Sequence, residues 1–120
     1  MNSPKQQSKI NQVFLERLTT LIISEMASGH VSLETIASEM FITRGQLNRK
    51  VKSITGITTQ QFAMDIRLKN ACKLIDNNPN IVISEVAYRC GFDDATSFSR
   101  AFRRFHDMSP SQYRNKKNEI

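Results

Sequence analysis

Two stretches of the chain repeat each other, and this repeat limits the possible folds more than any other sequence feature. Four apolar residues recur at an offset of 50, and nine further residues recur as identical or similar types at an offset of 51. The first set is Ile36, Ala37, Met40 and Ile42, matched by Val86, Ala87, Cys90 and Phe92. The second set is Leu47, Asn48, Arg49, Val51, Lys52, Ile54, Ile57, Thr58 and Phe62, matched by Phe98, Ser99, Arg100, Phe102, Arg103, Phe105, Met108, Ser109 and Tyr113. Each copy predicts a short helix, a tight turn and a longer basic helix, which is the layout of a helix-turn-helix unit.

Apolar residues recur at helical spacing outside the two copies as well. A first helix is expected to end near Gly29, and a long helix over residues 59–77 has apolar residues on nearly all sides, which predicts that both sides are covered. The predicted capping residues are Ser32, Thr43 and Asp93 or Asp94 at helix starts and Gly56 at a helix end, with Ser109-Pro110 starting the last helix. The sequence therefore predicts an all-α fold of about seven helices, with two helix-turn-helix units joined by a long linking helix.

The composition narrows the class of protein further. The 120 residues hold 17 Lys and Arg against 11 Asp and Glu, a net charge of +6, and only four Gly and three Pro, too few for an all-β fold with frequent turns. No apolar run reaches the roughly 18–20 residues of a membrane span, and residues 1–9 lack the apolar core of a signal peptide. Cys72 and Cys90 fit neither a metal-ligand spacing nor a disulfide framework. We therefore expect reduced thiols, a cytoplasmic, nucleoid-associated protein and no membrane contact by this segment.

The longer helix of each unit presents an outward face with the same chemistry. With Leu47 or Phe98 pointing inward, a step of 100° per residue places the apolar Val51 and Ile54, or Phe102 and Phe105, toward the core. The outward positions are then Gly45, Arg49 and Lys52 in the first unit, flanked by Gln46, Asn48 and Ser53, and Thr96, Arg100 and Arg103 in the second, flanked by Ser97, Ser99 and Arg104. Each face thus has a central arginine, a second cation one turn later and small polar neighbours.

Such a face is typical of a helix that reads the major groove of DNA. Arginine can donate two parallel hydrogen bonds to guanine and asparagine can do the same to adenine, while cations further along the helix meet phosphates. One basic helix is usually just a solvated surface, but here the face recurs at the repeat offset. The linking helix, about 18 residues or roughly 27 Å long, is of a length to place two such helices near the ~34 Å interval of successive major-groove faces. Because the units follow head to tail, we expect an asymmetric, bipartite site on double-stranded DNA.

The chain from about Ser32 to Arg114 resembles the DNA-binding domain of the AraC/XylS family of bacterial transcription regulators. The strongest resemblance is in ISEVAYRCGFDDATSFSRAFRRFHDMSPSQYR, residues 83–114. SLETIASEMFITRGQLNRKVKSITGITTQQF and IRLKNACKLI are similar to the first unit and the linking helix of that family. The resemblance implies seven helices, two helix-turn-helix units and insertion of both recognition helices into adjacent major grooves.

The resemblance also implies roles for single residues. The base-contact candidates that it implies are Gly45, Asn48, Arg49, Ala95, Thr96, Ser99 and Arg100, to which the outward faces add Gln46 and Ser97. The phosphate-contact candidates are Arg44, Lys52, Arg103 and Arg104. Arg67 matches an arginine that anchors the linking helix in the family. The sequence departs from the family at His106-Asp107, where a glycine is usual, and the small side chains of Gly45 and Ala95 leave the base preference at those positions open.

The resemblance places three segments along the chain. We expect residues 1–30 to form an N-terminal extension and first helix, packed on the domain or leading from an upstream module. Residues 31–115 are the expected AraC-type domain, with helix-turn-helix units at about 32–56 and 82–106 and the linking helix at about 59–77. Residues 116–120 are expected to be a polar tail.

The segment LNRKVKSITGIT is most similar to output domains of hybrid two-component regulators, in which a sensor kinase, a receiver and this domain share one chain. Under this hypothesis the signal input lies elsewhere, RNA polymerase is a partner, self-association occurs through upstream domains, and regions outside this segment could anchor the whole sensor in a membrane. A small stand-alone activator of the same family and a helical protein-interaction module are the alternatives.

An enzymatic function has little support. His30 and His106 have no carboxylate or thiol at a spacing that indicates a catalytic triad, and the sequence has neither a phosphate-binding glycine loop nor a metal-ligand cluster. We therefore expect no catalytic residue, no metal and no cofactor. The basic charge alone would also suit an RNA-binding protein, but all seven Phe are assigned to apolar stripes or turns, which leaves no platform for base stacking.

Overall fold

The computed structural model describes residues 4–118, with side chains described as far as residue 116, and within this range it contains seven helices and no strand. The helices are α1 (Pro4–Ala27), α2 (Leu33–Glu39), α3 (Arg44–Thr55), α4 (Thr59–Asn77), α5 (Ile83–Arg89), α6 (Ala95–His106) and α7 (Pro110–Asn118). The pairs α2–α3 and α5–α6 are the two helix-turn-helix units, and α4 links them. The predicted all-α fold is confirmed.

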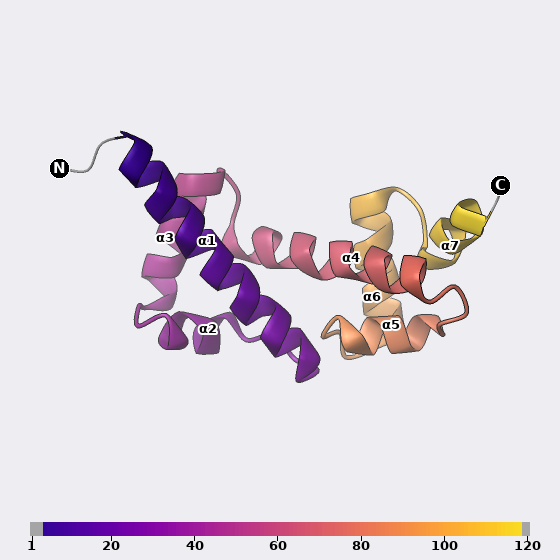
Figure 1. Ribbon diagram of the computed structural model, residues 1–120. Helices are drawn as coiled ribbons and strands as arrows, with labels where there is room; N and C mark the ends of the chain where they lie inside the picture. Colours follow the sequence, from indigo (N-terminus) through magenta and orange to yellow (C-terminus); the bar gives the residue numbers. More distant parts are fainter. Residues whose placement is uncertain (1–3, 119–120) are drawn as a thin grey trace.

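The molecule is elongated, with extents of 53 × 29 × 21 Å, and α4 runs between its two lobes (Figure 1). The core is divided into two hydrophobic clusters along this helix. Ala63 of α4 belongs to the first cluster, with α1, α2 and α3, whereas Leu68 and Ala71 belong to the second, with α5 and α6. The apolar residues on several sides of α4 thus serve two separate cores, which explains why the sequence of this helix is only weakly amphipathic.

Local capping fixes where the helices begin and end. The Ser32 side chain accepts a hydrogen bond from the backbone N–H of Thr35, and Thr43 and Thr58 each form a reciprocal capping box with the glutamine three residues later. Asp94 accepts from the N–H of Ser97 at 2.7 Å, and this hydrogen bond lowers the pKa of the Asp94 carboxyl. The predicted caps at Ser32, Thr43 and Asp94 are confirmed, as is Gly56, which ends α3 in a left-handed conformation.

The fully buried residues of α1 all lie in its second half, and Phe14 of the first half packs against the same cluster. Leu18, Ile22 and Met26 are buried, and α1 packs against α4. In the first half, Ile10 and Val13 are exposed, although they lie at helical spacing from Phe14 and Leu18. The difference arises because this half of α1 projects past the end of the first lobe (Figure 1).

One further prediction is wrong in detail. Phe105 was expected to point inward with Phe98 and Phe102, but its side chain is 41% exposed, because the last turn of α6 extends past the core and Phe105 lies at the edge of a groove that Ile57 also lines. Residues 116–118 of the expected polar tail form the last part of α7, which contains no Gly, and no Pro after its first residue. Residues 119 and 120 of that tail lie outside the described residues.

Candidate nucleic-acid interface

The outward face of α3 is held in place by the burial of its opposite side. Leu47 and Val51 are fully buried, so the residues across the helix face solvent. The exposed members of the predicted set are Gly45, Gln46, Asn48, Arg49 and Lys52, whereas Arg44 is half-buried. Ile54, predicted to point inward, is also only half-buried.

Some predicted contact residues of α3 already have partners inside the protein. Arg44 forms an ion pair with Glu34 at 2.8 Å and donates from Nε to the Asn48 side-chain oxygen at 3.1 Å. The Gln46 side-chain oxygen accepts from the Thr43 N–H at 2.8 Å as part of the capping box. Among the described residues, Arg49 and Lys52 have neither an ion pair nor a side-chain hydrogen bond. These two cations are therefore the side chains of α3 that are most available to a ligand.

The outward face of α6 is built in the same way. Phe98 and Phe102 are fully buried, and their rings lie 5.7 Å apart between centroids. The exposed members of the predicted set are Thr96, Ser97, Arg100, Arg103 and Arg104, whereas Ala95 and Ser99 are half-buried. Ser97 is engaged in the cap, because its N–H and its hydroxyl both donate to Asp94. The structure thus places an exposed arginine at the centre of each face, Arg49 in α3 and Arg100 in α6.

A pocket of about 660 Å³ lies where α3 meets the start of α4; we call it the α4 pocket. Its lining residues are Arg44, Asn48, Arg49, Lys52, Ser53, Thr58, Thr59 and Gln60, and none of them is acidic. The pocket brings together four predicted contact residues of α3 with two residues, Thr59 and Gln60, that sequence reasoning missed. The repeat could have drawn attention to Thr59, because this position has a hydroxyl in the first unit and the apolar Pro110 in the second.

Arg67 connects α4 to the turn of the second unit. Its guanidinium donates to the carbonyl oxygens of Cys90 and Gly91, at 2.9 and 2.8 Å, and lies 4.0 Å from the centre of the Phe92 ring. Burial lowers the pKa of Arg67, and the fixed fork of donors compensates for the lost hydration. These contacts give Arg67 the anchoring role that was expected of it, and they fix the position from which α6 starts.

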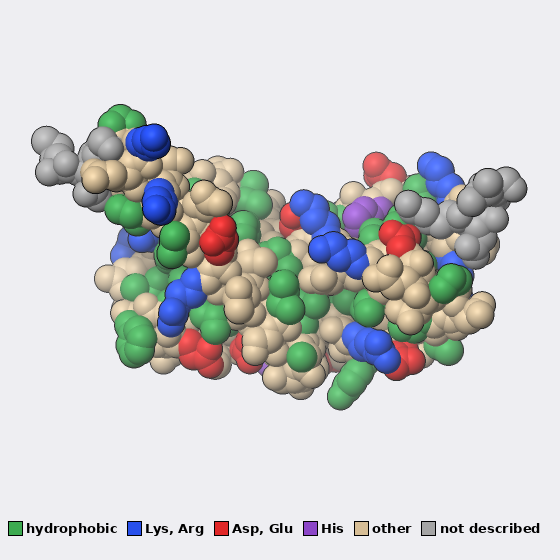
Figure 2. Space-filling view, in the orientation of Figure 1, with side chains coloured by type: hydrophobic (Ala, Val, Ile, Leu, Met, Phe, Trp, Pro, Cys, Tyr) green, Lys and Arg blue, Asp and Glu red, His purple; other side chains and the backbone are tan. Residues whose placement is uncertain are grey.

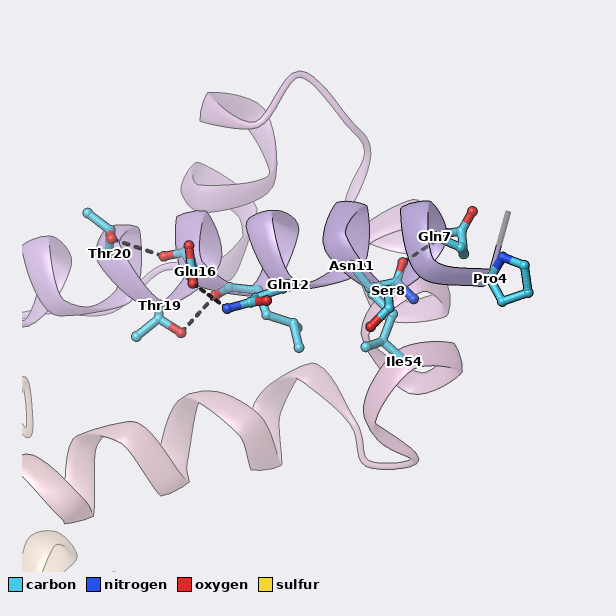
Figure 3. Close-up of a pocket in the computed structure, with 10 residues that line it drawn as sticks. Pro4, Gln7, Ser8, Asn11, Gln12, Glu16, Thr19, Thr20 and Ile54 are labelled. Carbon is cyan, nitrogen blue, oxygen red and sulfur yellow. Dashed lines mark hydrogen bonds between the residues drawn. The ribbon is translucent and has the colours of Figure 1, made fainter. Parts of the chain in front are cut away.

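A groove of about 1060 Å³ runs along α1 from Pro4 to Thr20 and reaches Ile54 of α3 (Figure 3). Its polar side chains pair along one helix rather than converging on a point: Gln12 donates to Glu16, and the Thr19 and Thr20 hydroxyls donate to backbone carbonyls one turn earlier. The molecular face of Figure 2 carries cationic and anionic side chains interspersed. Neither feature has the chemistry of a catalytic or anion-binding site.

Cys72 and His106 form a contact that could not be predicted from the sequence, because they are 34 residues apart. The Cys72 Sγ lies 3.6 Å from the His106 Nε2, and the imidazole packs 4.5 Å from the Phe102 ring. The pair joins α4 to the last turn of α6. Within the described residues no group of three or more His, Cys, Asp and Glu could hold a metal ion, and no helix is long and apolar enough to span a membrane.

A family model for a helix-turn-helix domain matches residues 36–116, about two-thirds of the chain. The chain belongs to the AraC-type family of helix-turn-helix DNA-binding domains. The matched residues include most of the first helix-turn-helix unit, from within α2 onward, and all of α4 and the second unit, so the repeat described above is the repeat of an AraC-type domain.

Three proteins illustrate what this AraC-type domain is similar to. Histidine kinase P4 of Formosa agariphila is 31% identical over 112 residues, which cover 93% of this chain and 8% of the kinase. The C-terminal domain of AraT, a response regulator from Geobacillus stearothermophilus, has a TM-score of 0.76 at 29% identity, covering 84% of this chain and 83% of that domain. The DNA-binding domain of the global transcriptional factor AdpA, in complex with a target DNA, has a TM-score of 0.71 at 27% identity, covering 82% and 90%. The chain spans less than half the length of the first curated relatives it matches.

Proposed function

We propose that this AraC-type domain binds double-stranded DNA in a sequence-specific manner and regulates transcription, with α3 and α6 entering successive major grooves. The observation that carries the proposal is that two helices of the same design present an exposed arginine, Arg49 or Arg100, opposite two fully buried apolar side chains. One continuous helix of 19 residues, about 28 Å long, joins the two units. That length suits the ~34 Å interval between successive major-groove faces.

We assign the base contacts to the middle of each face and the phosphate contacts to its second turn. Asn48, Arg49 and Arg100 have side chains that can form paired hydrogen bonds with base edges. Lys52 and Arg103, one turn further on, are placed to meet backbone phosphates. Gly45 and Ala95 offer a base edge no polar group, so the sequence preference opposite them depends on fit alone.

We further propose that the domain is the output module of a larger two-component regulator of the bacterial cytoplasm, with RNA polymerase as a protein partner and self-association through upstream domains. Support comes from histidine kinase P4, of which the matching region is a small part, and from AraT, whose C-terminal domain belongs to a response regulator. The coding sequence upstream of this segment tests whether the domain belongs to such a regulator. An open reading frame that continues into a receiver supports it, whereas an in-frame stop codon immediately upstream contradicts it.

The experiment that tests DNA reading is selection of duplexes from a random pool by the purified 120-residue chain at near-physiological salt. We expect enrichment of an asymmetric pair of short half-sites about one helical turn apart. The variant in which Arg49→Ala and Arg100→Ala are combined is the control, and it should enrich this pair far less. A palindromic product would contradict reading by one chain, and the absence of any enriched sequence would contradict sequence-specific binding by this domain.

A further inference from the structure

We propose that the α4 pocket is a phosphate-binding site, and that in the DNA complex it holds one backbone phosphate next to the bases contacted by α3. This inference rests on the proposed function and adds to it residues of the linking helix, Thr59 and Gln60, which lie outside both recognition helices. The evidence comes from an unpartnered hydroxyl, from the charges around the pocket and from the direction of α4.

The unpartnered hydroxyl belongs to Thr59. The side chain lines the α4 pocket, the residue is 1% exposed, and Oγ1 has no hydrogen-bond partner. A buried polar group without a partner destabilises a fold, so native proteins rarely keep one without a use for it. The fold does not require this hydroxyl, because the second unit has Pro110, also buried, at the corresponding first position of α7.

The charges around the pocket favour an anion. Three cations line it and no carboxylate does. Glu34 already pairs with Arg44, which leaves Arg49 and Lys52 to attract a ligand. Lys52 is the cation that binds the phosphate, and Arg49, which reaches toward the bases, adds positive charge beside it.

The third argument for an anion site is that the N-terminus of α4 lies at the pocket. The pocket is lined by Thr58, Thr59 and Gln60, which are the N-cap and the first two residues of this 19-residue helix. The capping box uses the N–H of Gln61, and the N–H groups of Thr59 and Gln60 precede the intrahelical ladder. The positive end of the helix dipole therefore coincides with the cations of α3, an arrangement that binds phosphate groups in other proteins.

Binding requires one local movement. Oγ1 of Thr59 is shielded from solvent, so a lining side chain must turn aside before a phosphate oxygen can reach it. Lys52 is long, flexible and exposed, and it would turn toward the phosphate on binding, whereas Arg49 stays directed at the bases. A duplex lying along α3 brings its backbone to this edge of the helix, where the base-reading Arg49 and the pocket are adjacent.

The first test compares Thr59→Val with the parent, because valine keeps the shape and removes the hydroxyl. We expect about tenfold weaker binding to every duplex, whether selected or of random sequence, since a hydrogen bond to a charged group is lost. In the absence of DNA, Thr59→Val should unfold at the same or a higher urea concentration than the parent, because an unpartnered hydroxyl has been removed. Thr59→Ser keeps the hydroxyl and should bind as the parent does. Thr20→Val, the same change on α1, is the matched control. Parent-like DNA binding by Thr59→Val would overturn the assignment to the DNA backbone.

Inorganic phosphate distinguishes a DNA phosphate from a free phosphorylated ligand. Titrated into isotope-labelled parent protein, it should shift the backbone N–H signals of Thr59 and Gln60, and this shift should be lost in Thr59→Val. If phosphate shifts these signals while DNA affinity does not depend on the Thr59 hydroxyl, the pocket serves a free phosphorylated ligand and the DNA assignment is wrong. If neither probe depends on the hydroxyl, the pocket is not a phosphate site. The comparison of Thr59→Val with the parent on a random-sequence duplex needs no selected operator. Its outcome therefore does not depend on whether the selection experiment succeeds.

Discussion

Phe41 and Gly91 occupy equivalent positions in the turns of the two helix-turn-helix units. Both have a left-handed backbone, with φ angles of 61° and 81°. Glycine adopts this conformation without strain, whereas other residues incur a cost of about 1–2 kcal/mol. The second unit requires glycine for space as well, because a Cβ at Gly91 would lie 3.2 Å from a methyl group of Val31. Phe41, in contrast, is 90% exposed.

Replacing Phe41 by glycine should therefore stabilise the protein. Phe41→Gly relieves the left-handed strain and sacrifices almost no burial, so we expect the free energy of unfolding to rise by about 1 kcal/mol. Gly91→Ala, the opposite change at the matching step, should lower it by about 1–3 kcal/mol. Urea denaturation of the two variants beside the parent measures both effects. A loss of stability in Phe41→Gly would mean that the exposed ring makes a contribution that its surroundings do not reveal.

Removal of the Arg67 guanidinium should loosen the second unit. Arg67→Ala leaves two buried carbonyl oxygens without their donor, so we expect the free energy of unfolding to fall by about 2–3 kcal/mol. Amide hydrogen exchange should accelerate in α5 and α6 more than in α2 and α3, because the lost contacts reach only the second turn. Arg17→Ala is the matched control, since Arg17 donates to the exposed carbonyl of Glu39 and should be nearly neutral. Uniform acceleration across both units would contradict the anchoring role.

Cys90 should make stability depend on pH in the alkaline range. Burial raises the pKa of the Cys90 thiol from 9.0 to about 11, so the folded protein keeps a proton that the unfolded chain releases. The free energy of unfolding should therefore fall as the pH rises from about 9 to about 11, by about 2–3 kcal/mol in all. Urea denaturation of the parent and of Cys90→Ala across this range isolates the effect. An equal fall in both proteins would show that other groups cause it.

The two proposed classes of DNA contact should respond differently to substitution. Arg49→Ala and Arg100→Ala should each lose about 1–3 kcal/mol on the selected site and relax discrimination at one base position. Lys52→Ala and Arg103→Ala should weaken binding to all sequences and flatten the salt dependence by about one ion. Affinities measured at several salt concentrations, for the selected duplex and single-base variants of it, separate these outcomes. A loss confined to one base position in Lys52→Ala would contradict its role as a phosphate contact.

The helices and their boundaries could be predicted from the sequence because both depend on local chemistry. The caps at Ser32, Thr43 and Asp94 bond to residues only three positions away, and the outward direction of Arg49 and Arg100 follows from helical periodicity. These features of the candidate interface needed no knowledge of the packing.

The features that the sequence did not predict depend on how distant segments pack. Cys72 and His106 are 34 residues apart, and their contact exists only because α6 crosses α4. The α4 pocket likewise exists only because the start of α4 folds back beside α3. Phe105 follows the apolar stripe of α6, yet it is exposed because the core ends before it does. Periodicity gives the direction of a side chain but not the extent of the core that it faces.

The division of the core along α4 has a consequence for how regulators of this kind diversify. Ala63 and Leu68 are about 1.4 turns apart, yet they belong to different clusters. Substitutions that alter the bases recognised by one unit can therefore accumulate without disturbing the packing beneath the other. The length of α4, which sets the separation between the units, cannot change in the same way. Every residue added to or removed from α4 would rotate one unit relative to the other by about 100° about the axis of α4. We expect descendants of such a gene to acquire new half-sites readily while inheriting the same interval between them.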